Sequence, residues 1–108
     1  MILLTDEIKK ELPPLYSSEE TPCERKTFHV RFFNPLGNQS WKIAEGSEQP
    51  DGDWLLFGLC DLGMGSPEWG YVLLSELESV SAGLGLGIER DICFGASRLH
   101  PEWGTVYA

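Results

Sequence analysis

The pattern in this sequence that comes closest to acid–base chemistry is a pair of carboxylates with an arginine between them: Glu89, Arg90 and Asp91. Residues two apart on a strand share a face, so Glu89 and Asp91 would point one way and Arg90 the other. A glycosidase needs two carboxyl groups that flank a sugar cleft, about 5 Å apart or wider, and a chain of 108 residues has little room for one. The triplet supports the hypothesis of a small ligand-binding domain or enzyme, which we keep as the alternative to an interaction protein. An ion pair of Arg90 inside the domain is the competing interpretation.

Patterns typical of metal binding are weak. Asp51 and Asp53 flank a glycine, but a calcium site needs six or more oxygen ligands on a longer frame, and a turn between strands is the favoured interpretation. The cysteines are odd in number and widely spaced, and two histidines are too few for the usual zinc site. These residues are Cys23, Cys60, Cys93, His29 and His100. We therefore expect no metal and no cofactor.

The glycine-rich run at 83–87 falls short of a phosphate-binding loop. Its spacing is GxGxG, a predicted helix precedes it, and its neighbouring charges are mostly negative. A dinucleotide fingerprint needs GxGxxG between a strand and a helix, so a tight connection that uses positive φ is the favoured interpretation. No nucleophile lies in a recognisable elbow motif. We predict no catalytic residue, and a protein that is not an enzyme is favoured.

The net charge is −9, and the surplus comes from the middle of the chain. Residues 43–89 contain nine acids and no base, whereas the rest of the chain has eight of each. Such a segment repels nucleic-acid phosphates and anionic membranes and attracts basic partners. Many acidic surfaces do no more than keep a protein soluble, and this alternative stays open. The sharper hypothesis is an acidic interaction protein that binds a basic protein surface, for example by imitating nucleic acid.

Tryptophan is frequent, with four in 108 residues. Most should be buried, because one indole can bury on the order of 200 Å². Trp54 and Trp69 have acidic neighbours, so either would be an anchor for a partner if it were exposed. The predicted protein-binding residues combine these two with acids of the middle segment. They are Glu45, Asp51, Asp53, Trp54, Asp61, Glu68, Trp69, Glu76 and Glu78.

Hydrophobic periodicity predicts one α+β domain over residues 1–108. A helix is expected at 4–12, with Thr5 as its N-cap. A short helix is expected at 75–80, where Ser75 and Glu78 fit a capping box. The central strand is apolar on both faces, which is typical of a strand covered on both sides. The strands of an antiparallel or mixed sheet are expected near 28–33, 40–45, 54–60, 69–74 and 88–94, with an irregular tail at 95–108.

Neither a membrane span nor a secretory signal is expected. The wholly apolar runs are far shorter than a bilayer requires, and the first apolar residues run directly into charged ones. We therefore expect a cytoplasmic protein that contacts neither membranes nor, directly, nucleic acid. The alternative of a structural accessory subunit also stays open.

Several segments, in their order along the chain, carry a family resemblance. They are LLT at 3–5, LPPLY at 12–16, FFNP at 32–35, Trp41 with EG at 45–46, GDWLLFG at 52–58, EWGY at 68–71, LSELES at 74–79 and LGIERD at 86–91 before Phe94. In these the chain resembles a family of small uncharacterised bacterial proteins, a domain of unknown function, carried on plasmids, phages and integrative elements. Residues from Ser97 onward depart from the pattern. The resemblance implies a mobile-element setting, and an anti-defence role would fit it. It implies no activity, cofactor or catalytic residue.

Overall fold

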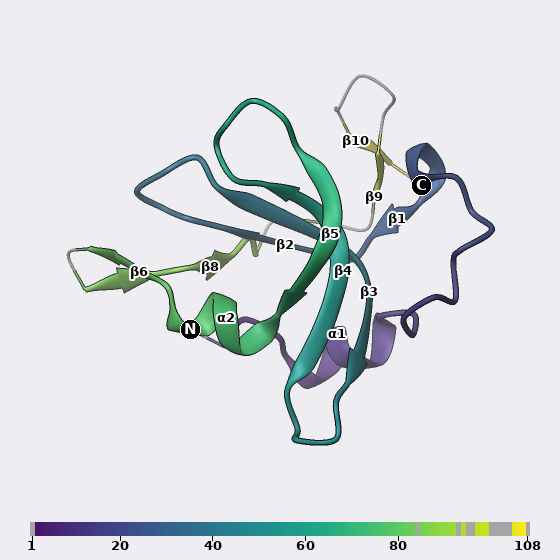
Figure 1. Ribbon diagram of the computed structural model, residues 1–108, viewed down its shortest axis with the longest axis horizontal. Helices are drawn as coiled ribbons and strands as arrows, with labels where there is room; N and C mark the ends of the chain where they lie inside the picture. The colour runs from purple at the N-terminus through teal and green to yellow at the C-terminus, as the bar shows by residue number, and fades with distance from the viewer. Residues whose placement is uncertain (1, 84, 93, 95–96, 100–104, 108) are drawn as a thin grey trace.

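A five-stranded antiparallel sheet forms the frame of the protein (Figure 1). The computed structural model describes residues 2–83, 85–92, 94, 97–99 and 105–107, and the sheet order is β5-β4-β3-β2-β8. These strands are β2 (Val30–Phe33), β3 (Ser40–Glu48), β4 (Trp54–Asp61), β5 (Glu68–Leu73) and β8 (Glu89–Arg90). The helical elements are α1 (Asp6–Glu11), α2 (Leu74–Ser79) and a 3-10 turn, η1 (Cys23–Arg25). The remaining strands are β1 (Thr27–Phe28), β6 (Ser81–Gly83), β7 (Leu86–Gly87), β9 (Ser97–Leu99) and β10 (Thr105–Tyr107). The predicted α+β class is confirmed.

Local sequence signals explain where α1 and the β3–β4 turn begin and end. The Thr5 hydroxyl accepts a hydrogen bond from the Ile8 N–H at 3.2 Å, which satisfies one free donor of the first turn of α1. In the β3–β4 turn, the Gln49 N–H donates to the Asp53 carbonyl at 2.7 Å. Gly52 lies in this turn with φ of 88°, a conformation that favours glycine. The predicted cap and turn are both present.

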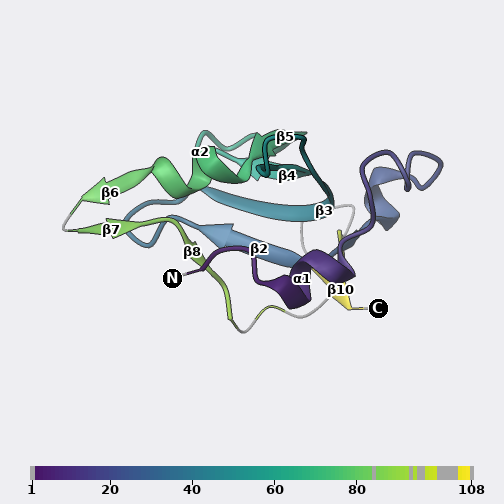
Figure 2. The same ribbon diagram turned by 90° about the horizontal axis from the view of Figure 1, so that it is seen from below.

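One face of the sheet carries the main core. Phe32, Ile43 and Leu56 from three adjacent strands are each 0% exposed. Leu12, which follows α1, and Leu77 from α2 pack into the same cluster. Figure 2 shows α1 lying against β2 and β3. Burial of these side chains is the main force that holds the helices on the sheet.

The opposite face is covered only in part. A second, smaller cluster buries Phe28, Ala44 and Leu59, and Trp69 packs against it. The strand β4 therefore contributes Leu56 to one cluster and Leu59 to the other, which explains why its sequence is apolar on both faces. Further along this face, Tyr71 on β5 is 51% exposed, so this part of the face remains open to solvent.

Gly58 on β4 lies so close to β3 that any side chain would collide with it. A Cβ there would stand 1.9 Å from the Lys42 carbonyl oxygen, and a backbone atom cannot turn aside. We expect Gly58→Ala to reduce the free energy of unfolding by about 1–3 kcal/mol, measured by urea denaturation. Gly70, its direct partner on β5, has open space around it, so Gly70→Ala is the matched control. Equal effects of the two substitutions would contradict the close approach.

The capping box predicted for α2 is wrong. The helix begins earlier than expected, with Leu73 at the N-cap position, and the Glu76 carboxylate accepts a hydrogen bond from the Leu73 N–H at 2.9 Å. The Ser75 hydroxyl instead donates a hydrogen bond to the Asp53 carboxylate at 2.5 Å. The serine that the local pattern assigned to the helix cap is therefore used in a tertiary hydrogen bond.

The C-terminal region also differs from the predicted irregular tail. The strand β9 pairs with β1, with Thr27 opposite Arg98, and β10 pairs with β9. Among the described residues of the strand predicted at 88–94, Glu89–Arg90 forms a strand paired with β2, and the Asp91 N–H donates to the Arg31 carbonyl at 2.9 Å. These short strands depend on partners far away in the chain, which local periodicity does not reveal. Cys93 and His100 lie outside the described residues.

Within the part of the chain that the structure describes, no helix has the length and apolar character needed to cross a bilayer.

Candidate functional site

The acids of the middle segment do not gather on one surface. Asp61 ends β4 and Glu68 begins β5, at one end of this hairpin. Five other acids lie at the opposite end, where Ser75 of α2 binds Asp53 of the β3–β4 turn. Glu45 lies within β3 and Glu89 in β8, so neither belongs to these two groups. The eight residues of β4 separate the two ends by about 23 Å, at about 3.3 Å per residue. The acids at that second end are Glu48, Asp51, Asp53, Glu76 and Glu78.

The two tryptophans of the predicted site lie at these separate ends. Trp54 is half-buried against the main core, with the Lys9 ammonium 5.7 Å from its ring centroid. Trp69 stacks between Phe28 and Phe57, with centroid distances of 5.5 Å to each. Both indoles are therefore held by intramolecular packing. The structure brings Trp69 and Glu68 to one hollow and leaves Trp54 on the far side of the hairpin.

Glu45 is buried instead of exposed, at 3% of its accessible surface. A β-bulge between Ile43 and Glu45 shifts the register of β3 against β4, so that Glu45 lies opposite Phe57. Without the bulge, Glu45 would share the face of Ile43 and point into the main core. The bulge thus directs this carboxylate to the partly covered face.

The Glu45 carboxylate holds the segment that follows α1. It accepts hydrogen bonds from the Tyr16 N–H at 2.8 Å, the Ser18 N–H at 3.1 Å and the Ser18 hydroxyl. The Lys26 ammonium lies 4.0 Å from it and is itself 6% exposed. Lys26 also donates to the Ser18 carbonyl and, at 3.0 Å, to the Ser18 hydroxyl. Each buried charge is paired and hydrogen-bonded, which offsets the cost of its desolvation.

A hollow of about 500 Å³ opens above this buried pair, and we name it the tyrosine pocket. Its lining residues include Tyr16, Glu19, Lys26, Glu45, Phe57 and Tyr71. Tyr16 has φ of 69°, unusual for a residue with a side chain. Local strain of this kind often accompanies functional sites. Sequence reasoning missed the pocket. The signal present was an acid at 45, where strict alternation with Trp41 and Ile43 predicts a core-facing side chain.

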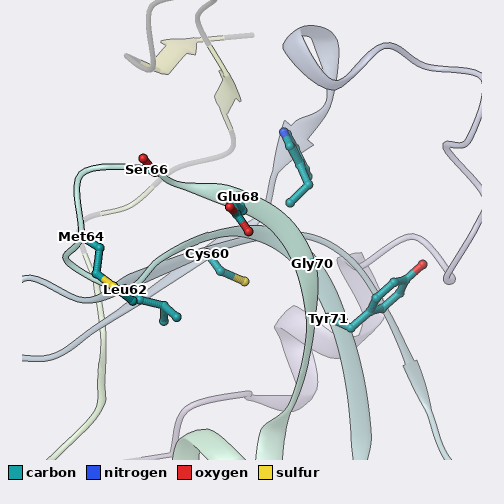
Figure 3. Close-up of a pocket in the computed structure, with 8 residues that line it drawn as sticks. Cys60, Leu62, Met64, Ser66, Glu68, Gly70 and Tyr71 are labelled. Atoms are coloured by element: carbon teal, nitrogen blue, oxygen red, sulfur yellow. The ribbon is translucent and has the colours of Figure 1, made fainter.

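A second hollow, of about 380 Å³, lies along the free edge of β5, and we name it the edge groove. It is lined by Cys60, Leu62, Met64, Ser66, Glu68, Trp69, Gly70 and Tyr71. In Figure 3, Tyr71 points to the opposite side of β5 from Cys60 and Leu62, so the groove wraps around the strand edge. Leu62 is 50% and Met64 80% exposed. Burial raises the pKa of the Cys60 thiol, so this cysteine stays protonated at neutral pH.

The Glu89–Asp91 triplet is engaged in holding the fold together. Arg90 donates hydrogen bonds to the carbonyls of Ile2 and Leu3, at 3.3 Å for the latter, and so fastens the N-terminal segment to β8. Asp91 pairs with Arg31 at 3.3 Å. Arg90 and Asp91 also line a small hollow of about 240 Å³ with His29. Burial lowers the pKa of His29, and Glu11 opposes this shift.

Metal ligands are not brought together among the described residues, where no three of the His, Cys, Asp and Glu side chains form a group that could hold an ion. The Asp51–Asp53 segment is used in the turn itself, since Asp51 accepts a hydrogen bond from the Asp53 N–H at 3.0 Å.

Asp53 makes stability depend on pH. The Ser75 hydroxyl, the largest cause, and the N–H groups of Trp54 and Ser75 lower the pKa of Asp53 by binding its charged form. Their contribution is therefore present above the ordinary aspartate pKa and is lost as the pH falls through the lowered value. We expect Asp53→Asn to lower Tm at pH 6, with the difference from wild type shrinking towards pH 2. Glu48→Gln is the exposed control, and parallel Tm curves for Asp53→Asn and wild type would contradict the linkage.

Together, the fold and its hollows define a small α+β domain built on an antiparallel sheet in which β5 is an outer strand. The chain belongs to the family described as protein of unknown function (DUF2958), whose model matches residues 3–106. The predicted membership of a domain of unknown function is thereby confirmed. Neither the curated proteins nor the solved structures contain a match to the chain.

Proposed function

We propose that this domain is a protein-interaction module, and not an enzyme, that binds an extended basic segment of a partner protein along the free edge of β5. The observation that carries the proposal is the position of β5 at the outside of the sheet, beside the edge groove. Alternate residues of an outer strand leave N–H and C=O groups available for pairing. Extended peptides bind other sheets by adding a strand there, while neighbouring pockets take alternate side chains.

The charge of this edge favours a basic partner. Glu68 begins β5, and α2, which follows β5 directly, carries Glu76 and Glu78, all three exposed. An extended segment laid along β5 would have carboxylates near both of its ends. Such an arrangement steers basic segments and accelerates their association at low salt.

The proposal also includes the cellular location, the mobile-element origin and the kind of partner. A cytoplasmic location and carriage on a plasmid, phage or integrative element would make a nucleic-acid-handling or defence protein the natural partner, bound through a basic surface. Identification of the partner by pull-down from the host tests this setting. The recovered protein should bind wild type at stoichiometric yield and fail to bind a variant with an altered edge groove.

The binding mode is tested with peptides selected from a random library for binding to the wild-type protein. We expect the selected peptides to be basic, to protect β5 backbone amides from hydrogen exchange, and to associate more slowly as salt rises. Leu62→Asp should weaken their binding about tenfold, because it places a charge among apolar contacts. Leu36, also 50% exposed but on the β2–β3 turn, supplies the matched control Leu36→Asp.

Charge reversal tests the electrostatic part separately. Glu68→Lys combined with Glu78→Lys should slow association, while Glu76 is left intact because it caps α2. Selected peptides that leave β5 amides unprotected, or that bind both leucine variants equally, would refute the edge-docking mode.

A further inference from the structure

The tyrosine pocket has an aromatic wall that comes from two distant parts of the chain. Tyr16 lies on the segment after α1, and Phe57 and Tyr71 lie side by side on β4 and β5. The ring centroids are 4.9 Å apart for Phe57 and Tyr71 and 6.4 Å for Tyr16 and Tyr71, with tilted planes. Tyr16 is 57% and Tyr71 51% exposed, so ring surface is available to a ligand.

The pocket also carries a net negative charge. Its charged lining residues are Glu19, Lys26 and Glu45, two acids and one base. The Lys26 ammonium is committed to Glu45 and to Ser18, so Glu19, which is exposed, contributes an unbalanced carboxylate at the mouth.

The Tyr71 phenol responds to this negative potential. Desolvation against its neighbours raises the pKa of Tyr71, and a hydrogen bond with Tyr16 acts in the same direction. The charges of Glu45 and Glu19 raise it further. The negative potential of both carboxylates therefore reaches the aromatic wall of the pocket.

We propose that the tyrosine pocket is a binding site for an organic cation, with a quaternary ammonium or guanidinium group held against Tyr16, Phe57 and Tyr71. A cation is attracted to the negative face of an aromatic ring, and several rings beside a carboxylate are the usual arrangement for binding such groups. A cavity of about 500 Å³ is large enough for a group of this size. The buried Glu45–Lys26 pair keeps the Tyr16 segment in place and so holds the wall together.

This site does not depend on the proposed edge docking, although Tyr71 lines both hollows. The cation has two possible sources, a free small molecule or a basic side chain of a bound protein segment. The chemistry is the same for both, and the probes below separate them.

The first test is an NMR titration of the wild-type protein with choline and with its neutral isostere, 3,3-dimethylbutan-1-ol. We expect choline to shift the ring resonances of Tyr16, Phe57 and Tyr71 saturably and to bind at least tenfold more tightly than the neutral isostere. Tyr71→Leu should weaken choline binding about threefold to thirtyfold, whereas Tyr71→Phe, which keeps the ring, should retain it. Glu19→Gln, an exposed substitution that leaves the packing intact, should also weaken binding.

The second test separates the sources with capped arginine amide and a seven-residue extended peptide that contains one arginine. If the pocket serves a free small molecule, choline should bind at least as tightly as either arginine probe. If the pocket serves a basic side chain of a bound protein segment, the peptide should bind more than tenfold more tightly than capped arginine. Leu62→Asp should leave choline binding unchanged, so failure of edge docking is distinguishable from failure of the pocket. Equal binding of choline and its neutral isostere, or unaltered binding by both Tyr71→Leu and Glu19→Gln, would overturn the proposal.

Discussion

Glu45→Ala is expected to destabilise the protein by about 3–5 kcal/mol, because it leaves the buried Lys26 ammonium without its counter-charge. The substitution also removes the acceptor for the N–H groups of Tyr16 and Ser18. Urea denaturation followed by tryptophan fluorescence measures the loss. Limited proteolysis should in addition cut the segment at 13–20 faster, since Glu45 is the group that fastens it to the sheet.

The control for this prediction lies on the same strand. Glu48 is exposed, and Glu48→Ala should change the free energy of unfolding by less than about 0.5 kcal/mol. Replacing both partners, as Lys26→Met with Glu45→Met, should cost less than the sum of the single substitutions, because no buried charge is then left unpaired. A cost for Glu45→Ala as small as that for Glu48→Ala would show that the pair does not hold this segment.

Phe32→Ala is expected to cost about 3–5 kcal/mol, the usual loss when a large aromatic side chain is removed from a core. Phe32 is 0% exposed and lies opposite Trp41 on the face that α1 and α2 cover. The cavity that remains cannot close easily, because its walls belong to the hydrogen-bonded strands β2 and β3. A chemical denaturation curve provides the measurement.

Phe33 supplies the comparison, since it is the next residue of β2 and points to the other face. It is half-buried, and its ring lies 5.2 Å from the Arg31 guanidinium. Phe33→Ala should therefore cost clearly less than Phe32→Ala. The reverse order would mean that the main core lies on the other face of the sheet.

Elements that depend on near neighbours in sequence were predictable. The Thr5 cap, the helix that ends before Pro13 and the β2–β3 hairpin all follow from propensity, capping and turn chemistry within a few residues. The strand β4 was identifiable because both of its faces are apolar, and the two hydrophobic clusters account for this. In each case the local preference and the tertiary packing agree.

Elements that depend on distant partners were not predictable in the same way. The strands β9 and β10 exist through pairing with β1 and with each other. Ser75 does not cap α2 as predicted, because its hydroxyl donates a hydrogen bond to the carboxylate of Asp53, which is distant in sequence. The acid-rich middle segment was visible in the sequence, but the length of β4 places seven of its nine carboxylates at two separate ends of the hairpin, while Glu45 is buried on β3 and Glu89 lies on β8.

The sequence by itself determined the α+β class, most of the sheet, the charge surplus and the family, because these rest on residue type and short-range periodicity. Only the tertiary structure decided which side chains meet. The bulge at Ile43–Glu45 is a shift of one residue in register, and it turns Glu45 from the main core towards Lys26 and the two tyrosines. Strand periodicity is two, so a one-residue shift exchanges the faces. The acid at 45 indicates that strict alternation fails in β3, but the sequence does not show where the bulge lies or which groups the carboxylate meets.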